Sequence, residues 1–145
     1  MPPPPDAAVS AGPGILGHDI AVLLLRLALG TIFIAHGLDR LLVWTLAGTG
    51  AFFGSIGLPA WVAWPITGLE LVGGALLILG VRVRWVALIL AVELAGASMP
   101  HLVKGWMFTA SGGGWEYPAF LAVTALALSF LDGGKLTVFR LVGQR

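Results

Sequence analysis

Three ionisable residues lie inside long apolar stretches of this sequence, where a charge is costly: Arg26, Glu70 and Glu93. An arginine or acidic side chain at the centre of a membrane-spanning helix costs about 2.5 to 3.5 kcal/mol on insertion scales, so such residues pair and face the interior of a helix bundle. One cation beside two carboxyl groups leaves one negative charge in excess, so we expect one glutamate to hold a proton. The sequence therefore predicts a buried polar group of these three residues. Such a group either fixes the register of the helices or handles protons or a substrate.

Small residues share the helix faces of this group. Arg26 aligns with Gly30 and Gly37, and Glu70 aligns with Gly73 and Gly74, at helical spacing. Because small residues let membrane helices approach closely, these faces are expected to be the contacts between helices.

A second group of polar and aromatic residues is expected at one end of the bundle. Histidine and arginine side chains can donate hydrogen bonds to carbonyl oxygens, and aromatic rings can pack against a flat ligand. This combination predicts a ligand mouth that takes a ring such as a quinone head group. An aromatic belt at the membrane surface would explain the same tryptophans, and the favourable effect of a helix dipole on Glu116 would explain that residue. The members are His36, Arg40, His101, Glu116, Trp106, Trp115 and Tyr117.

The elements that must position these residues follow from the composition. The chain has 145 residues, of which 58% are hydrophobic and 10% are charged, whereas soluble domains carry about 25% charged residues. Four apolar stretches, at about 20–38, 60–80, 83–99 and 115–131, have roughly the 20 residues that cross a bilayer. The predicted fold is an all-α bundle of four transmembrane helices in one domain, residues 19–135.

The ends of the chain and its basic residues predict an orientation. Residues 1–18 are rich in proline and predict a disordered or extended arm, and residues 136–145 form a short basic tail. Basic residues are enriched on the cytoplasmic side of membrane proteins. Arg40 and Lys104 are the basic residues of one side; the other side carries Arg82, Arg84, Lys135, Arg140 and Arg145. Both termini are therefore predicted to be cytoplasmic.

Charge and cysteine content exclude several classes of function. The net charge is +1 and the basic residues form no cluster, so nucleic acid is not an expected partner. Because the chain has no cysteine, disulfides, thiolate metal sites and cysteine catalysis are absent. The compact spacings that make zinc motifs specific are missing around His36, His101 and Glu116, so no metal is expected.

The order of these motifs resembles the DoxX family of small four-helix bacterial and archaeal membrane proteins. The resemblance covers about residues 20–135 and rests on Arg26, Leu29-Gly30, the run His36-Gly37-Leu38-Asp39-Arg40-Leu41, the run Glu70-Leu71-Val72-Gly73-Gly74, Leu79-Gly80, His101 and Trp115-Glu116-Tyr117. It implies a link to quinone-dependent oxidoreduction. It also implies that the charged and polar signature of the family falls on Arg26, Arg40, Glu70, His101 and Glu116. One departure is that a lysine common after the His-Gly element is replaced by Arg40.

Taken together, the sequence predicts a multi-pass protein of a bacterial or archaeal plasma membrane. It would be the small integral subunit of a quinone-linked oxidoreductase, with other membrane subunits as partners, no covalently bound cofactor and a quinone as the expected ligand. No flavin, haem or iron–sulfur motif is visible, so an accessory role without its own redox centre is expected, and no catalytic residue is assigned. Two alternatives stay open: a purely structural accessory subunit, and a carrier of a small solute.

Overall fold

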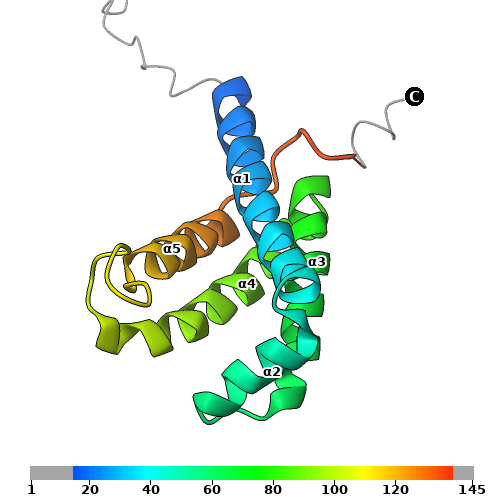
Figure 1. The fold of residues 1–145 in the computed structure, drawn as a ribbon. Coiled ribbons are helices and arrows are strands. Elements are labelled where there is room, and N and C mark those ends of the chain that lie inside the picture. Colours follow the sequence, from blue (N-terminus) through cyan, green and yellow to red (C-terminus); the bar gives the residue numbers. More distant parts are fainter. Residues whose placement is uncertain (1–14, 139–145) are drawn as a thin grey trace, which may run out of the picture.

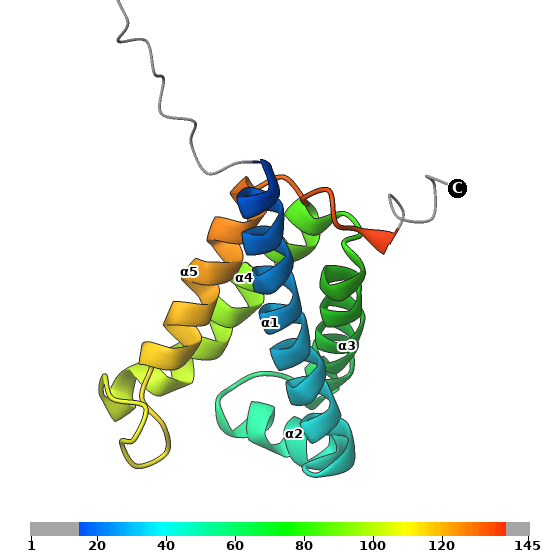
Figure 2. The ribbon, with the colours of Figure 1, turned by 90° about the horizontal axis from the view of Figure 1, so that it is seen from above.

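The computed structural model describes residues 15–138, which form helices joined by turns and short irregular segments. Two helix pairs make the body of the molecule (Figure 1). Helix α1 (Ile15–Leu42) packs mainly against α3 (Ala63–Leu79), and α4 (Val83–Ser98) packs mainly against α5 (Glu116–Phe130). The two pairs lie close together near the start of α1 and diverge toward α2 (Figure 2). The predicted all-α fold is confirmed.

Short helices occupy the two longer connections. Helix α2 (Thr45–Ser55) and the 3-10 helix η1 (Ala60–Val62) link α1 to α3, and the 3-10 helix η2 (Met99–Lys104) follows α4. The sequence analysis did not predict α2. Its segment contains three glycines and two threonines, residues of low helix propensity, so its stability comes from packing against its neighbours.

Helix α1 is longer than its apolar pattern suggested. It begins at Ile15, so the last four residues assigned to the extended arm are helical, and it ends at Leu42. The rest of that arm and most of the basic tail lie outside the described residues.

Three helical segments are long and apolar enough to cross a bilayer. They are Gly17–Leu42 with 26 residues, Ala60–Leu79 with 20 and Val83–Lys104 with 22, and their mean hydropathies are 2.0, 1.8 and 1.8. Helix α5 is apolar but shorter, with 15 residues, or about 22 Å at 1.5 Å per residue. The protein is thus a multi-pass membrane protein with three long apolar helices and a fourth, shorter one.

Apolar side chains cover the outside of the bundle as well as its core. The core contains Val22, Leu29, Leu77, Leu90 and Leu128, which come from all four of the longer helices. On the outward faces, large apolar side chains such as Trp64, Val92 and Phe130 are 69%, 68% and 77% exposed. A helix that is apolar on all sides suits a lipid environment.

Glycines set the contact between α1 and α3. A Cβ atom added to Gly30 would lie 2.7 Å from the carbonyl oxygen of Gly74, and one added to Gly74 would lie 2.7 Å from the carbonyl oxygen of Gly30. Only residues without a side chain fit at this distance, so the two glycines fix where the helices touch. This contact determines which polar residues of α1 and α3 meet.

Candidate functional site

Arg26 is buried, with 1% of its surface exposed, but it does not contact either glutamate. Its Nε and Nη2 atoms donate hydrogen bonds to the carbonyl oxygens of Leu77 and Ile78, both at 2.9 Å. Its Nη1 atom donates to the carbonyl oxygens of Gly133, at 3.0 Å, and Leu136, at 2.9 Å. The last carbonyl groups of a helix lack partners within that helix, and the helix dipole favours a cation there. The prediction that Arg26 pairs with a carboxylate is therefore wrong, because carbonyl dipoles surround its charge instead.

The register of α1 against α3 explains this outcome. The two helices run antiparallel and touch through their glycines, so positions toward the start of α1 lie beside the end of α3. Arg26 therefore comes level with Ile78, and Arg40, which is about four turns further along α1, comes level with Glu70. Hydropathy gave only the approximate depth of each residue, which could not distinguish the two arginines as partners of Glu70.

Glu70 forms its ion pair with Arg40. The distance between Arg40 Nε and Glu70 Oε2 is 2.9 Å, and the side chains are 22% and 3% exposed. The Arg40 guanidinium also lies over the ring of Phe53 in α2, 5.7 Å from its centroid. A buried ion pair of this kind demands a precise arrangement of the elements around it. It links α1, α2 and α3 at the end of the bundle where the helix pairs diverge.

Glu93 on α4 faces the same region. Its Oε2 atom is buried and has no hydrogen-bond partner among residues 15–138. Two members of the predicted polar group, Glu70 and Glu93, thus line the same cavity. The cation that pairs with Glu70 is Arg40 and not the predicted Arg26.

A cavity of about 530 Å³ separates the two helix pairs at this end. Every major element except α2 contributes to its wall. The polar lining consists of His36, Arg40, Glu70, Glu93, His101 and Tyr117, and the rest of the wall is formed by Ile32, Phe33, Leu94, Ala97, Phe108, Gly113, Gly114, Pro118 and Leu121. A few polar groups in a largely apolar cavity of this volume are typical of a small-molecule site.

His101 lines one side of the cavity and contacts the loop before α5. The Nδ1 atom of His101 lies 2.9 Å from the carbonyl oxygen of Gly113. Because a carbonyl oxygen only accepts, Nδ1 carries the proton in this contact, and in the neutral ring Nε2 is left as a hydrogen-bond acceptor. The contact also fixes the glycine-rich loop before α5 over the cavity.

The predicted mouth is divided into two places. His36, Arg40, His101 and Tyr117 line the cavity, whereas three other members line a separate open hollow of about 790 Å³ on the outer side of α5: Trp106, Trp115 and Glu116. Tyr117 and Phe108 line both.

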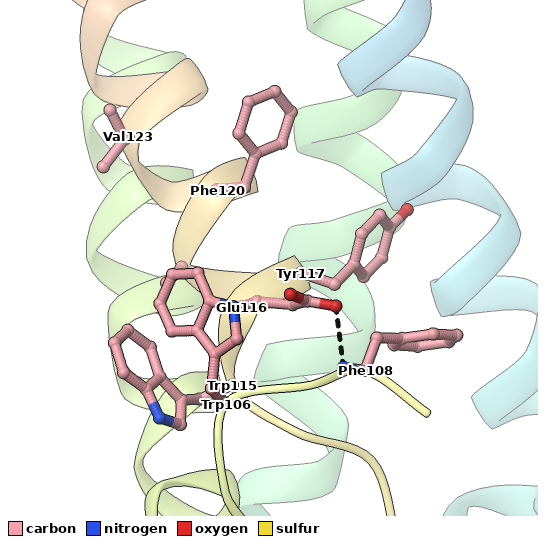
Figure 3. Close-up of a pocket in the computed structure, with 8 residues that line it drawn as sticks. Trp106, Phe108, Trp115, Glu116, Tyr117, Phe120 and Val123 are labelled. Atoms are coloured by element: carbon pink, nitrogen blue, oxygen red, sulfur yellow. Dashed lines mark hydrogen bonds between the residues drawn. The ribbon is translucent and has the colours of Figure 1, made fainter. Parts of the chain in front are cut away.

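Within the hollow, side chains hold the loop before α5 in place. Glu116 Oε1 accepts a hydrogen bond of 2.7 Å from the main-chain N–H of Phe108 (Figure 3). The rings of Trp106 and Trp115 meet edge to face, with centroids 4.4 Å apart. Figure 3 places these two rings on one side of Glu116 and the pair Phe108 and Tyr117 on the other. The prediction that all seven residues form one mouth is therefore wrong, because α5 separates the tryptophans from the cavity.

Within residues 15–138 no three histidine, aspartate or glutamate side chains gather in a way that could hold a metal ion. The polar side chains that line the cavity include the ion pair of Arg40 and Glu70 and the rings of His36, His101 and Tyr117.

Comparison with known proteins identifies the family. The DoxX family model matches residues 21–110. The chain belongs to the DoxX family. A curated relative, "Putative oxidoreductase CatD" of Bacillus subtilis (strain 168), is 37% identical over 117 residues, which cover 81% of this chain and 82% of that protein. No solved structure matches the chain.

The resemblance inferred from the order of the motifs is thus confirmed. The matched part of this DoxX protein runs from α1 to the loop before α5 and contains Arg40, Glu70, Glu93 and His101. The ion pair and His101, which line the same cavity, therefore lie in the part of the chain that the family model matches, whereas Tyr117 lies beyond it.

Sequence reasoning missed two features of the site in this DoxX protein. It did not join Arg40 to Glu70, although Phe33, Gly37 and Arg40 follow one another at helical spacing and so share a face of α1. It also missed Phe53 beneath the guanidinium, because α2 itself was not predicted. This spacing places Arg40 on a helix contact but does not identify its partner, because Arg26 lies on the same face of α1. No signal was available for the second feature.

Proposed function

We propose that this DoxX protein is the small membrane subunit of an oxidoreductase and that the cavity between its helix pairs binds a quinone head group. The observation that carries the proposal is the meeting of Arg40, Glu70, Glu93 and His101 at one cavity of about 530 Å³ between membrane helices. The name of the Bacillus subtilis relative supports the link to oxidoreduction.

The polar groups of the cavity suit both forms of a quinone. A quinone presents carbonyl oxygens, which accept hydrogen bonds, and its reduced form presents hydroxyl groups, which donate them. Arg40 and the Tyr117 hydroxyl can donate, and Glu93 Oε2 and the Nε2 atom of neutral His101 can accept. The apolar remainder of the wall, such as Phe33, suits the faces of a flat ring.

The redox centre is proposed to lie on a partner subunit. Iron–sulfur clusters are held by cysteine thiolates, and this chain has no cysteine. The chain would therefore hold the quinone near an electron donor that another protein provides. Gentle extraction of the native membrane followed by mass spectrometry should recover the chain at fixed stoichiometry with a larger redox protein, and recovery only as a free protein would contradict the subunit role.

The proposal places both termini in the cytoplasm and the cavity near the outer surface of the plasma membrane. The excess of basic residues near the Arg82 turn and in the C-terminal tail supports this orientation.

Direct binding of a water-soluble quinone tests the site. Protein purified in detergent should bind 2,3-dimethoxy-5-methylbenzoquinone, and the variant Tyr117→Phe should weaken binding by about tenfold, because one hydrogen bond contributes about 1 to 1.5 kcal/mol. His101→Phe should weaken it at least as much. The control Trp106→Phe, in the separate hollow, should bind as the wild type does. Equal binding by all variants, or no binding by the wild type, would contradict the proposed site.

A further inference from the structure

A second cavity, of about 280 Å³, adjoins the first. The two cavities share four lining residues, Arg40, Glu93, Ala97 and His101. The polar groups of the second cavity are therefore the ones it shares with the first, and they lie at the boundary between the two. The rest of its wall is apolar and comes from α2, the segment after it, η1, α3, α4 and η2: Phe52, Phe53, Ile56, Leu58, Val62, Ile66, Val92, Gly96 and Pro100.

The rim of the second cavity is apolar and reaches the surface of the chain. Val92 on α4 is 68% exposed, and Leu58 and Ile56, which follow α2, are 45% and 38% exposed. Val92 belongs to a helical segment long and apolar enough to cross the bilayer. The second cavity therefore opens among side chains that suit contact with acyl chains.

We propose that the ligand of this protein is an amphiphile, whose polar ring occupies the first cavity and whose apolar chain passes through the second into the bilayer. This inference rests on the proposed function and specifies it: the substrate is a quinone with a prenyl or alkyl chain, which enters sideways from the membrane, and not a small ring compound from water. Glu93 lies at the boundary with a buried carboxylate oxygen that has no hydrogen-bond partner among residues 15–138. It is placed to contact the ring close to where the chain leaves it.

Gly96 offers a way to fill the second cavity alone. It lines the second cavity and not the first, and a Cβ atom added there meets nothing within 4 Å. The variant Gly96→Phe places a ring in the space proposed for the chain. Gly68 on α3 provides the matched control, because a Cβ atom there also meets nothing within 4 Å and the residue lines neither cavity.

Two probes distinguish the contribution of the chain to binding from that of the ring: 2,3-dimethoxy-5-methylbenzoquinone, which has no chain, and its 6-decyl derivative. Gly96→Phe should weaken binding of the decyl compound by about tenfold, since a long apolar chain loses its place in the protein but is still solvated by detergent. It should leave binding of the compound without a chain unchanged. Gly68→Phe should bind both probes as the wild type does.

The outcomes distinguish this inference from the proposed function. If the wild type binds both probes and Gly96→Phe weakens neither, or weakens both equally, the route of the chain is wrong and the ring site stands. If the wild type binds neither probe, the proposed function and this inference both fall.

A measurement on the wild type keeps the inference testable if Gly96→Phe does not fold. A quinone carrying a photoreactive diazirine at the end of its chain should label residues of α2 (Thr45–Ser55) or the segment that follows it. Labelling confined to α5 (Glu116–Phe130) would overturn the proposed route.

Discussion

The ion pair between Arg40 and Glu70 gives the sharpest test of how the site is held together. We consider the single variants Arg40→Met and Glu70→Gln and the double variant that carries both. The Nε and Oε2 atoms are 2.9 Å apart, and the Glu70 side chain is 3% exposed. At an effective dielectric constant of 20, unit charges at this distance attract by about 6 kcal/mol, and desolvation of both groups offsets much of it.

Removal of one partner leaves the other charge buried. Breaking such a pair costs about 3 to 5 kcal/mol in other proteins when the charge left behind is fully buried, as Glu70 is in Arg40→Met, and less when that charge is partly hydrated, as Arg40 with 22% exposure is in Glu70→Gln. We expect the free energy of unfolding to fall by about 3 kcal/mol in Arg40→Met and about 2 kcal/mol in Glu70→Gln. The double variant should lose about 2 kcal/mol rather than the sum of about 5, which gives a coupling energy of about 3 kcal/mol. The contact with Phe53 is lost in both variants that lack Arg40, so it cancels from the coupling energy.

Unfolding of detergent-purified protein by SDS, followed by tryptophan fluorescence, measures these free energies. Glu93→Gln serves as the control, because Glu93 Oε2 has no hydrogen-bond partner among residues 15–138 and its amide is close in shape. It should change stability by less than about 1 kcal/mol. Additivity of the two single variants to within about 0.5 kcal/mol would refute the argument that this pair holds α1 to α3.

Three further predictions concern the remaining architecture. Arg26→Lys should lower the free energy of unfolding by about 3 kcal/mol or more in the same titration, because an ammonium group cannot reach all four carbonyl oxygens that the planar guanidinium contacts. Gly74→Ala should lower it by about 1 to 3 kcal/mol through overpacking against α1, whereas Gly96→Ala, where the Cβ atom meets nothing within 4 Å, should be neutral or slightly stabilising. In intact cells, a membrane-impermeant maleimide should label Ser111→Cys from outside and Asp132→Cys only after permeabilisation, and because the natural chain has no cysteine each label reports one site.

Each of these predictions has a clear contrary result. Wild-type stability of Arg26→Lys would mean that the carbonyl contacts of Arg26 contribute little. Equal effects of alanine at Gly74 and Gly96 would show that α1 and α3 do not touch where the structure places them. Labelling of both cysteine variants from outside would contradict the proposed orientation.

The fold class and the depth of the charges could be read from the sequence. Long apolar stretches and scarce charges predict membrane helices whatever their tertiary contacts, because no other solvent suits such a surface. Glu70 was predicted to face a helix contact from its spacing with Gly73 and Gly74, and all three residues are buried on one face of α3. These properties depend on composition and on periods of a few residues, which a single sequence contains in full.

The partners of those charges were decided only by the tertiary structure. Arg26 and Arg40 lie on the same helix, and both stand at depths from which a long side chain could reach a carboxylate. The close approach at Gly30 and Gly74 sets the register of α1 against α3. In this register Arg40 pairs with Glu70, and Arg26 donates hydrogen bonds to the carbonyl oxygens at the end of α3. One turn of slippage between two helices moves every contact by about 5.4 Å, more than the length of an ion pair, and periodicity within each helix does not contain that relative position.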